Sequence, residues 1–269
     1  MSVRGTLRAL PALLRVGFAE AVAYRAELLV WVLATTMPLI MLVLWTAVAS
    51  DAPIGRYGEA EFVAYFLATF IVRQLTGSWA AWEMNMDVRQ GTLAMRLLRP
   101  VHPLVTYTIE NIAALPMRLA VSVPVAVIAL FTVGRDQITR DPTLWLLAGG
   151  ALLGGWLITV LVNLFIGCLA FFLESSTHVM DVYLAAFFVM SGYTVPIDVF
   201  PPVVRRIADA LPFRYQIGLP VELVTAAYDG RHAAAWEMLG RQWLFVALLL
   251  AVTAFAWKRG VRRFAAYGG

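Results

Sequence analysis

Long apolar stretches separated by short polar segments dominate the pattern along this chain. A helix needs about 20 apolar residues to cross the hydrocarbon core of a bilayer. Six stretches approach or exceed that length: 28–49, 61–82, 112–133, 143–173, 179–195 and 241–257. We expect the overlong fourth to be tilted or broken, and the fifth is short. The short alternating strands of a membrane barrel do not occur. The pattern predicts an all-α integral membrane protein with six transmembrane helices.

The residues before the first span form a region of their own. Apolar side chains recur there at helical spacing, at Leu7, Leu10, Leu14 and Phe18. Arg8 and Arg15 lie among them, which predicts an amphipathic helix in the membrane interface. The alternative is an ordinary leader with snorkelling arginines. Arg15 and Glu20 interrupt the apolar run, so a cleavable signal peptide is disfavoured. We therefore divide the chain into an interface helix at 1–27, a six-span domain at 28–257 and a basic tail at 258–269.

The segment 196–240, before the last span, carries helical periodicity and five prolines. Its apolar face comprises Val203, Val204, Ile207 and Leu211. Pro202 suits the start of a helix and Pro212 its end. A second helix is expected from Pro220 to about Gly230. Both are too short to span, so we predict outer re-entrant helices beside the sixth span, where protein buries the backbone. A loose surface loop is the alternative.

Composition and charge support the membrane assignment. The chain is 61% hydrophobic and 14% charged, whereas soluble domains carry roughly a quarter charged residues. The net charge of +4 comes mostly from arginines that flank apolar spans. These are topology signals rather than a nucleic-acid surface. Cys168 is the only cysteine, which excludes an intrachain disulfide and disfavours a cysteine metal site.

Basic residues near the span ends set the predicted orientation, because they concentrate on the cytoplasmic side. One side carries Arg4, Arg8, Arg15, Arg25, Arg89, Arg96, Arg99, Lys258, Arg259, Arg262 and Arg263. The short loops of the other side carry only Arg56, Arg135 and Arg140. Both termini, and the loop after the second span, are therefore predicted to be cytoplasmic.

That loop contains the basic stretch RQGTLAMRLLRPVHPLVTY at 89–107. Gly91 breaks the helix that descends from the second span, Thr92 is expected to cap a new helix, and Pro100 to end it. Its predicted faces are apolar, with Leu93 and Leu97, and basic, with Arg96 and Arg99. A short amphipathic helix at a membrane surface suits either lipid headgroups or a cleft in a cytosolic partner. Composition alone does not choose between them.

Ionisable residues within or beside spans are candidates for function, because they are costly in lipid. Arg73 and Gln74 lie in the second span and are candidate polar contacts of a translocation path. Arg118 lies in the third, where a structural pair or a snorkelling arginine is favoured. Glu174, His178 and Asp181 cluster between the fourth and fifth spans. We expect no metal there, because polar residues are usual at such a boundary.

Other motifs limit the functional classes. No catalytic motif occurs, and a phosphate-binding G-x-x-x-x-G-K-[ST] loop is impossible because the sole lysine, Lys258, precedes Arg259. Gly150 and Gly154, flanked by Gly149 and Gly155, form a small-residue motif that lets helices approach closely. It serves packing within the subunit or contact with a second copy.

The order of these motifs resembles the ABC-2 type permease family of bacterial ABC transporters. The residues that carry the resemblance are Gly91, Leu93, Leu97, Pro100, Ser191, Gly192, Pro196, Phe200, Pro201, Leu211, Pro212 and Phe213. It implies that residues 92–99 form a cytoplasmic coupling helix, with Gly91, Thr92, Leu93, Arg96, Leu97, Arg99 and Pro100 at the ATPase contact. It also implies an N-terminal connecting helix and an outer re-entrant motif of Gly192, Pro196, Phe200, Pro201 and Pro212.

The resemblance further implies a permease subunit in the bacterial inner membrane, paired with a second identical or different permease among membrane lipids. ABC ATPase subunits would use ATP and Mg, and this chain would bind no cofactor. Export of an amphipathic, lipid-linked or drug-like substrate is expected. The alternative is a membrane-embedded enzyme or assembly scaffold without an ATPase partner.

Overall fold

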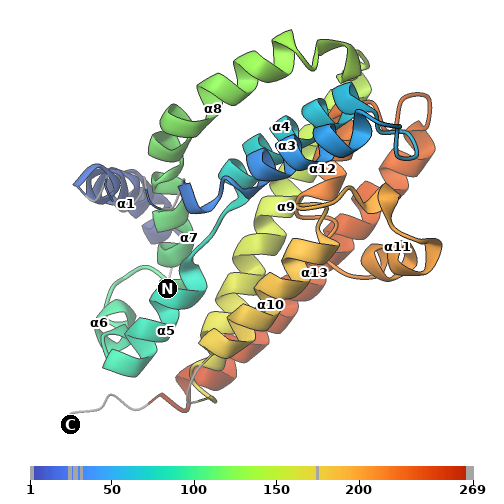
Figure 1. Ribbon diagram of the computed structural model, residues 1–269. Helices are drawn as coiled ribbons and strands as arrows, with labels where there is room; N and C mark the ends of the chain where they lie inside the picture. Colours follow the sequence, from blue (N-terminus) through green and yellow to red (C-terminus); the bar gives the residue numbers. More distant parts are fainter. Residues whose placement is uncertain (1–2, 24–25, 27–29, 31–32, 174–175, 265–269) are drawn as a thin grey trace.

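The computed structural model describes residues 3–23, 26, 30, 33–173 and 176–264 (Figure 1). These residues form helices and no sheet. The two longest helices, α9 (Pro142–Leu169) and α13 (His232–Val261), pack along one another (Figure 1). Both are long and apolar enough to cross a membrane. The all-α prediction is confirmed, and α9 is one unbroken helix rather than a broken one.

The second predicted span is interrupted. It consists of α4 (Glu59–Thr76) and α5 (Ala80–Gln90), separated at residues 77–79, so the continuous helix predicted at 61–82 is wrong. The third is α8 (Leu115–Thr132), which lies within three residues of the predicted 112–133 and follows α7 (Pro103–Ala113) and Ala114, whose backbone is helical. Pro116 lies in the first turn of α8 and Pro124 inside it, and the helix is visibly curved (Figure 1).

The first and fifth spans are represented by shorter apolar helices, α3 (Met37–Ala49) and α10 (Thr177–Met190). Much of the predicted start of the first span lies outside the described residues. The chain is irregular at Thr35–Thr36, and Pro38 begins α3 rather than kinking a longer helix. Proline suits this first turn because it has no N–H to satisfy. The helix α10 ends five residues before the predicted end at residue 195.

Two short helices lie between α10 and α13, as the prolines predicted. After a 3₁₀ turn, η2 (Ile197–Val199), α11 (Pro202–Asp209) starts at the expected proline, and α12 (Gly218–Val224) follows. The first ends before Pro212, and the second starts two residues before Pro220. Its residues 218–223 are buried, mainly against α9 and α4. The contact of α12 with α13, the sixth span beside which it was predicted to lie, is smaller than its contacts with α9 and α4.

The glycine motif of α9 mediates packing within the subunit. A methyl group added to Gly154 would lie 2.6 Å from the Gln242 side chain of α13, and one on Gly155 would lie 2.7 Å from the Gln216 carbonyl oxygen. Gln242 Nε2 donates hydrogen bonds to the carbonyl oxygens of Ala151 and Tyr215, at 2.7 Å each. These glycines therefore let α13 and the segment before α12 approach α9.

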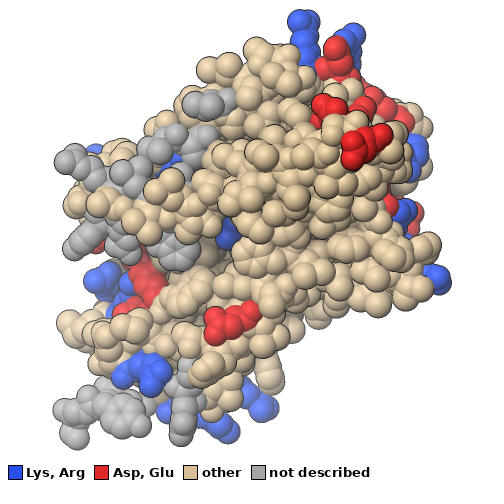
Figure 2. Space-filling view, viewed as in Figure 1, with Lys and Arg blue, Asp and Glu red and all other residues tan. Residues whose placement is uncertain are grey.

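Charged side chains gather at two ends of the molecule. Figure 2 shows a largely uncharged band between them, as expected of a surface that faces lipid. The C-terminal end of α13 lies at the same end of the molecule as α5 and α6 (Figure 1). The N-terminal helix α1 (Val3–Ala23) packs on α7. A helix is thus present where an interface helix was predicted, and its position in the membrane stays a prediction.

Candidate functional site

The candidate coupling segment is a helix–turn–helix–turn–helix at one end of the molecule. Gly91 ends α5 with φ of +76°, a left-handed conformation that glycine adopts without strain. The next helix, α6 (Leu93–Leu97), has only five residues. The imidazole of His102 then caps α7, accepting a hydrogen bond from the Leu104 N–H at 3.2 Å. The helix α6 ends at Leu97. This is three residues before Pro100, the residue that was predicted to end it.

Arg96 fastens α6 to the helices on both sides. Its guanidinium contacts Glu83 at 2.6 Å, Asp87 at 2.7 Å and Glu110 at 2.8 Å. It also lies over the ring of Tyr107, 4.3 Å from the centroid. We call Arg96 and the three carboxylates the α6 cluster. Because such charge-assisted contacts are strong and directional, the short helix is held rigidly against α5 and α7.

Two hydroxyl groups complete the α6 cluster through Asp87. Tyr107 Oη donates to Asp87 Oδ2 at 2.6 Å, and Thr92 Oγ1 donates to Asp87 Oδ1 at 2.7 Å. Thr92 occupies the N-cap position of α6, but its side chain makes no capping hydrogen bond. The prediction that Thr92 caps the helix is therefore wrong, since its hydroxyl joins α6 to α5 instead.

Three carboxylates share one guanidinium in the α6 cluster. Burial, together with the negative charge of Glu110, raises the pKa of Glu83 to about 8, although Arg96 opposes the shift. Glu83 lies just past the predicted end of the second span, at the charged end of the molecule. The cluster thus holds more negative than positive groups, and one carboxyl retains a proton near neutral pH.

The outward side of α6 and the turn after it carry exposed apolar and basic groups. Leu93 is fully buried and anchors the helix, whereas Met95 is 65% exposed and Leu98 is 80% exposed. Leu97 is more than one-third exposed, so only Leu93 of the predicted apolar face is buried. Arg96 points to carboxylates, and Arg99 is exposed, so the predicted basic face is also divided.

At the opposite end, the segment after α10 is fixed by backbone contacts. Gly192 has φ of +83°, and a methyl group there would lie 2.5 Å from Tyr65 Oη. Tyr65 Oη donates to the Gly192 carbonyl at 2.8 Å, and the Gly218 N–H donates to the Ser191 carbonyl at 2.9 Å. Only glycine fits at position 192, and the motif joins α4 to the start of α12. Pro196 and Pro201 occupy the N-cap positions of the 3₁₀ turn η2 and of α11, without a side-chain capping hydrogen bond.

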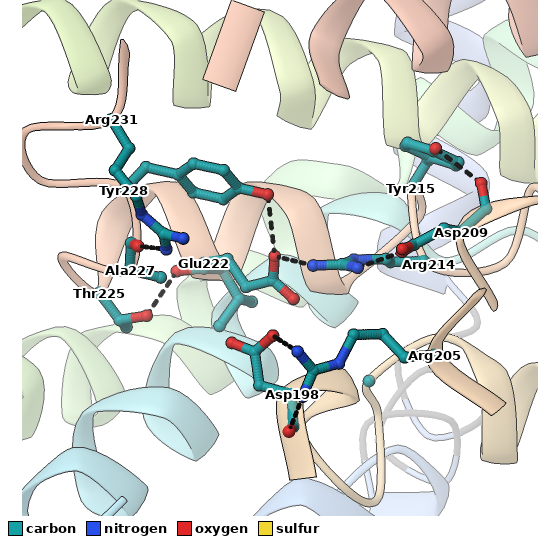
Figure 3. A network of polar contacts seen from close by, with 12 residues as sticks. Asp198, Arg205, Asp209, Arg214, Tyr215, Glu222, Thr225, Ala227, Tyr228 and Arg231 are labelled. Carbon is teal, nitrogen blue, oxygen red and sulfur yellow. Dashed lines mark hydrogen bonds and ion pairs between the residues drawn. The ribbon is translucent and has the colours of Figure 1, made fainter. Parts of the chain in front are cut away.

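Buried ion pairs hold α11 and α12 together (Figure 3). Arg214 Nη2 contacts Glu222 Oε2 at 2.7 Å, and Nη1 contacts Asp209. We call these three residues the α12 cluster. The side chains of Arg214 and Glu222 are 7% and 1% exposed. Nearby, Asp198 pairs with Arg56 at 3.3 Å and with Arg205 at 3.9 Å. These ion pairs link the segments that lie at this end of the helix bundle.

The predicted polar contacts of the second span lie at the interruption between α4 and α5. Gln74 Nε2 donates to Thr35 Oγ1 at 2.9 Å. Arg73 lies over the rings of Phe187 and Tyr193, 5.2 Å and 5.8 Å from their centroids. A small cavity joins Arg73 and Gln74 to Arg118 of the third span. The structure therefore brings together two arginines that the sequence left in separate spans.

Sequence reasoning missed the carboxylates of the α6 cluster. Glu83 and Asp87 are spaced i, i+4 on one face of a helix, a signal for a shared cationic partner. Nothing in the sequence pointed to Glu110 as the third. For the predicted polar cluster after the fourth span, Glu174 lies outside the described residues. Within the described part of the chain, no group of three His, Cys, Asp or Glu is arranged to hold a metal.

Comparison with family models gives one finding that covers most of the chain. The model described as an ABC-2 family transporter protein matches residues 32–268. The match includes both the α6 cluster and the α12 cluster. A comparison with curated proteins finds no match.

Proposed function

This chain belongs to the ABC-2 transporter family, and from that premise we propose how it is coupled to ATP and what it moves. Members of this family are the transmembrane permeases of ABC transporters and are not themselves catalytic. We propose that a separate ABC ATPase subunit binds α6 and the turn after it, and that both termini face the cytoplasm of a bacterial inner membrane.

The observation that best supports the ATPase contact is that α6 has one buried side and one exposed side. Its buried side is fixed to α5 and α7 through Leu93 and Arg96, while Met95, Leu98 and Arg99 are exposed. An apolar protrusion with a basic neighbour, at a charged end of the molecule, fits a cleft in a soluble partner better than lipid tails. Because Arg96 is occupied within the chain, Met95, Leu98 and Arg99 carry the proposed contact. The remaining motif residues, Gly91, Thr92, Leu93, Leu97 and Pro100, shape and support it.

Export of an amphipathic or lipid-linked substrate is the proposed activity, carried out by two permease copies. Large apolar side chains are exposed along α13, among them Trp236, Leu244, Leu248 and Phe255. A second copy or lipid would cover them. Aromatic rings of α10 and the following turn, Phe187, Phe188 and Tyr193, contact one another beside Arg73. An apolar wall beside a cation suits a molecule with a tail and a charged head.

Two substitutions at opposite ends test the coupling assignment. Leu98→Asp should abolish the stimulation of ATP hydrolysis when the permease is reconstituted with its ABC ATPase partner. Val203→Asp is the matched control, because Val203 is 62% exposed at the other end. Unchanged stimulation by Leu98→Asp, in a protein that still folds, would refute the docking role of α6.

Orientation is tested with the same positions. Cys168 is buried and is the only cysteine, so a Cys168→Ala background makes each introduced cysteine unique. A membrane-impermeant maleimide should label Leu98→Cys only in inside-out vesicles and Val203→Cys only in right-side-out vesicles. The reverse pattern would overturn the proposed topology.

A further inference from the structure

An apolar stripe on the exposed side of α13 leads to a group of basic residues at the end of the helix. Leu244, Leu248 and Phe255 are each more than half exposed. Their spacing of four and then seven residues places them on one face, opposite the residues that α13 buries. Arg259 continues this face in the last turn of the helix, and Arg263 follows in the turn after it. Both arginines are exposed, so basic groups stand at one end of the apolar stripe.

The stripe is about as long as one leaflet of a bilayer is thick. Leu244 and Phe255 are 11 residues apart, which is about 16 Å along a helix. Half of the hydrocarbon core is about 15 Å. Trp236, which is also exposed, lies 19 residues before Phe255, about 28 Å away along the axis. Tryptophan is common at membrane interfaces, so Trp236 and Arg259 match the expected levels of the two boundaries of the hydrocarbon core.

Four exposed cations at this end of α13 have no acidic partner among the residues that the structure describes. They are Lys258, Arg259, Arg262 and Arg263. The sequence contains no Asp or Glu from residue 238 to residue 269. At the opposite end, by contrast, Arg56, Arg140 and Arg205 each contact a carboxylate. The four cations are therefore available to an anion from outside the chain.

Two of these cations lie over aromatic rings. The Arg259 guanidinium is 4.8 Å from the centroid of the Phe255 ring, and that of Arg263 is 5.1 Å from the centroid of the Phe172 ring, in the turn after α9. Lys and Arg side chains protrude from this end of the molecule in Figure 2. A positive charge alone would suffice as a topology signal. Stacking in addition keeps the two guanidinium groups at the boundary between apolar and polar surface, with their edges free to donate hydrogen bonds.

We propose that an anionic phospholipid binds along this face, with its phosphate at Arg259 and Arg263 and an acyl chain on Leu244, Leu248 and Phe255. A guanidinium group binds phosphate oxygens through paired hydrogen bonds. Basic clusters beside a membrane span attract anionic headgroups, and here the apolar stripe supplies the contact for the tail. The lipid is a resident ligand rather than the transported substrate, so the inference goes beyond the proposed function.

A lipid fits this face better than a protein partner does. A second copy related by a two-fold axis would place the same residues against one another, so the basic ends would meet and repel. An acidic surface of a soluble protein could neutralise the cations, but it would leave Leu244 and Leu248 uncovered in the hydrocarbon core. A phospholipid with a negative head covers both the cations and the stripe.

The test uses the purified full chain in an uncharged maltoside detergent. Thermal unfolding is measured with phosphatidylglycerol and with phosphatidylcholine that bears the same acyl chains. At a hundredfold excess over its Kd, phosphatidylglycerol should raise the Tm by about 5 °C, and phosphatidylcholine should raise it by less than half as much. Because salt screens exposed charges, about 0.5 M NaCl should reduce the difference between the two lipids.

Variants assign the effect to this face. Arg259→Gln combined with Arg263→Gln should lose at least half of the difference between the lipids. Arg135→Gln combined with Arg140→Gln is the matched control and should keep the difference, because it removes the same charge from exposed arginines at the opposite end. Arg259→Lys combined with Arg263→Lys should keep most of it, because the charges remain. Leu248→Asn keeps all four cations but breaks the stripe, so it should lower the Tm rise with phosphatidylglycerol.

Three outcomes would overturn the proposal. One is an equal Tm rise with the two lipids in the wild type; if Arg259→Gln with Arg263→Gln then also loses ATPase binding, the cations belong to the soluble partner. Another is an equal loss in the two double glutamine variants, which would make net charge the cause. The third is a disulfide-linked dimer formed through Leu248→Cys, in a Cys168→Ala background and phosphatidylglycerol membranes, which would assign the stripe to a second copy. The lipid measurement needs no ATPase, so a failure of the coupling proposal leaves its result unchanged.

Discussion

Arg96 and Arg214 perform the same structural task at opposite ends of the molecule. Each holds a short helix, α6 or α12, to its neighbours through carboxylates. The surroundings differ, because the charged side chains of the α6 cluster are 16–27% exposed, whereas the Arg214–Glu222 pair of the α12 cluster is 7% and 1% exposed and only Asp209, at 27%, reaches water. The α6 cluster also has three carboxylates for one cation. A buried, paired cluster fixes a position, while a partly hydrated cluster with excess negative charge tolerates adjustment.

Removing the buried cation should have the largest effect. Arg214→Met leaves Glu222 without its partner in the interior, so the free energy of unfolding should fall by about 3–5 kcal/mol. The measurement is a denaturing-detergent titration followed by circular dichroism. Arg214→Met combined with Glu222→Met should recover part of the loss, because no unpaired buried charge remains. Equal losses in the single and double variants would show that burial of charge does not distinguish the α12 cluster.

The corresponding change in the α6 cluster should cost less. Arg96→Met should lower the free energy of unfolding by about 2 kcal/mol, since water reaches the carboxylates left behind. It should also reduce ATPase stimulation by loosening α6. Arg99→Met is the control for stability alone, because an exposed arginine should change the free energy of unfolding by less than about 0.5 kcal/mol. A loss as large as that of Arg214→Met would contradict the difference between the two ends.

The excess negative charge predicts a pH dependence. The raised pKa of Glu83, about 8 against an ordinary value of 4.5, means that the folded chain holds a proton that the unfolded chain has lost between these values. This contribution to stability is therefore present at low pH and is lost as pH rises from about 4.5 to about 8.

Glu83→Gln should remove that dependence. The difference in Tm between Glu83→Gln and the wild type, measured from pH 5 to pH 8, should widen in favour of the variant as pH rises. The same comparison for Glu237→Gln, an exposed residue of α13, should stay flat. A difference that stays flat would show that Glu83 is ionised throughout.

The smallest effects should come from the single hydroxyl contacts. Thr92→Val removes the 2.7 Å hydrogen bond to Asp87, and Tyr228→Phe removes the 3.5 Å contact with Glu222. We expect each to lower the free energy of unfolding by about 1 kcal/mol or less. The same titration measures both. A cost for Thr92→Val near that of Arg96→Met would mean that Asp87, rather than the guanidinium, holds α6.

The sequence predicted α9 well, because it has a long uninterrupted apolar run. It located α13 but not its start, which lies nine residues before the predicted 241–257, because the first turns of that helix carry charged and polar residues. It did not predict the interruption at Gly77–Trp79, where small and aromatic residues continue the apolar run and hide the break. The prolines between α10 and α13 were informative for the opposite reason. A proline restricts the backbone locally, so Pro202 located the start of α11 without knowledge of its neighbours.

The sites were harder to predict than the helices. The position of α6 followed from Gly91 and Pro100, but the inward direction of Arg96 depends on Glu83 and Glu110, which come from helices on either side. Arg73 and Arg118 are 45 residues apart in sequence, and only the packing of α4 against α8 brings them together. Local periodicity carries no information about such pairings.

The interruption at residues 77–79 lies beside the start of α8, since Arg118 reaches Gly77 across it. The unit formed by α5, α6 and α7 is joined to α4 at this interruption, and α5 also packs along α9. By thermodynamic reciprocity, any factor by which docking of the proposed ATPase on α6 changes the affinity for a transported substrate must equal the factor by which that substrate changes the affinity of docking.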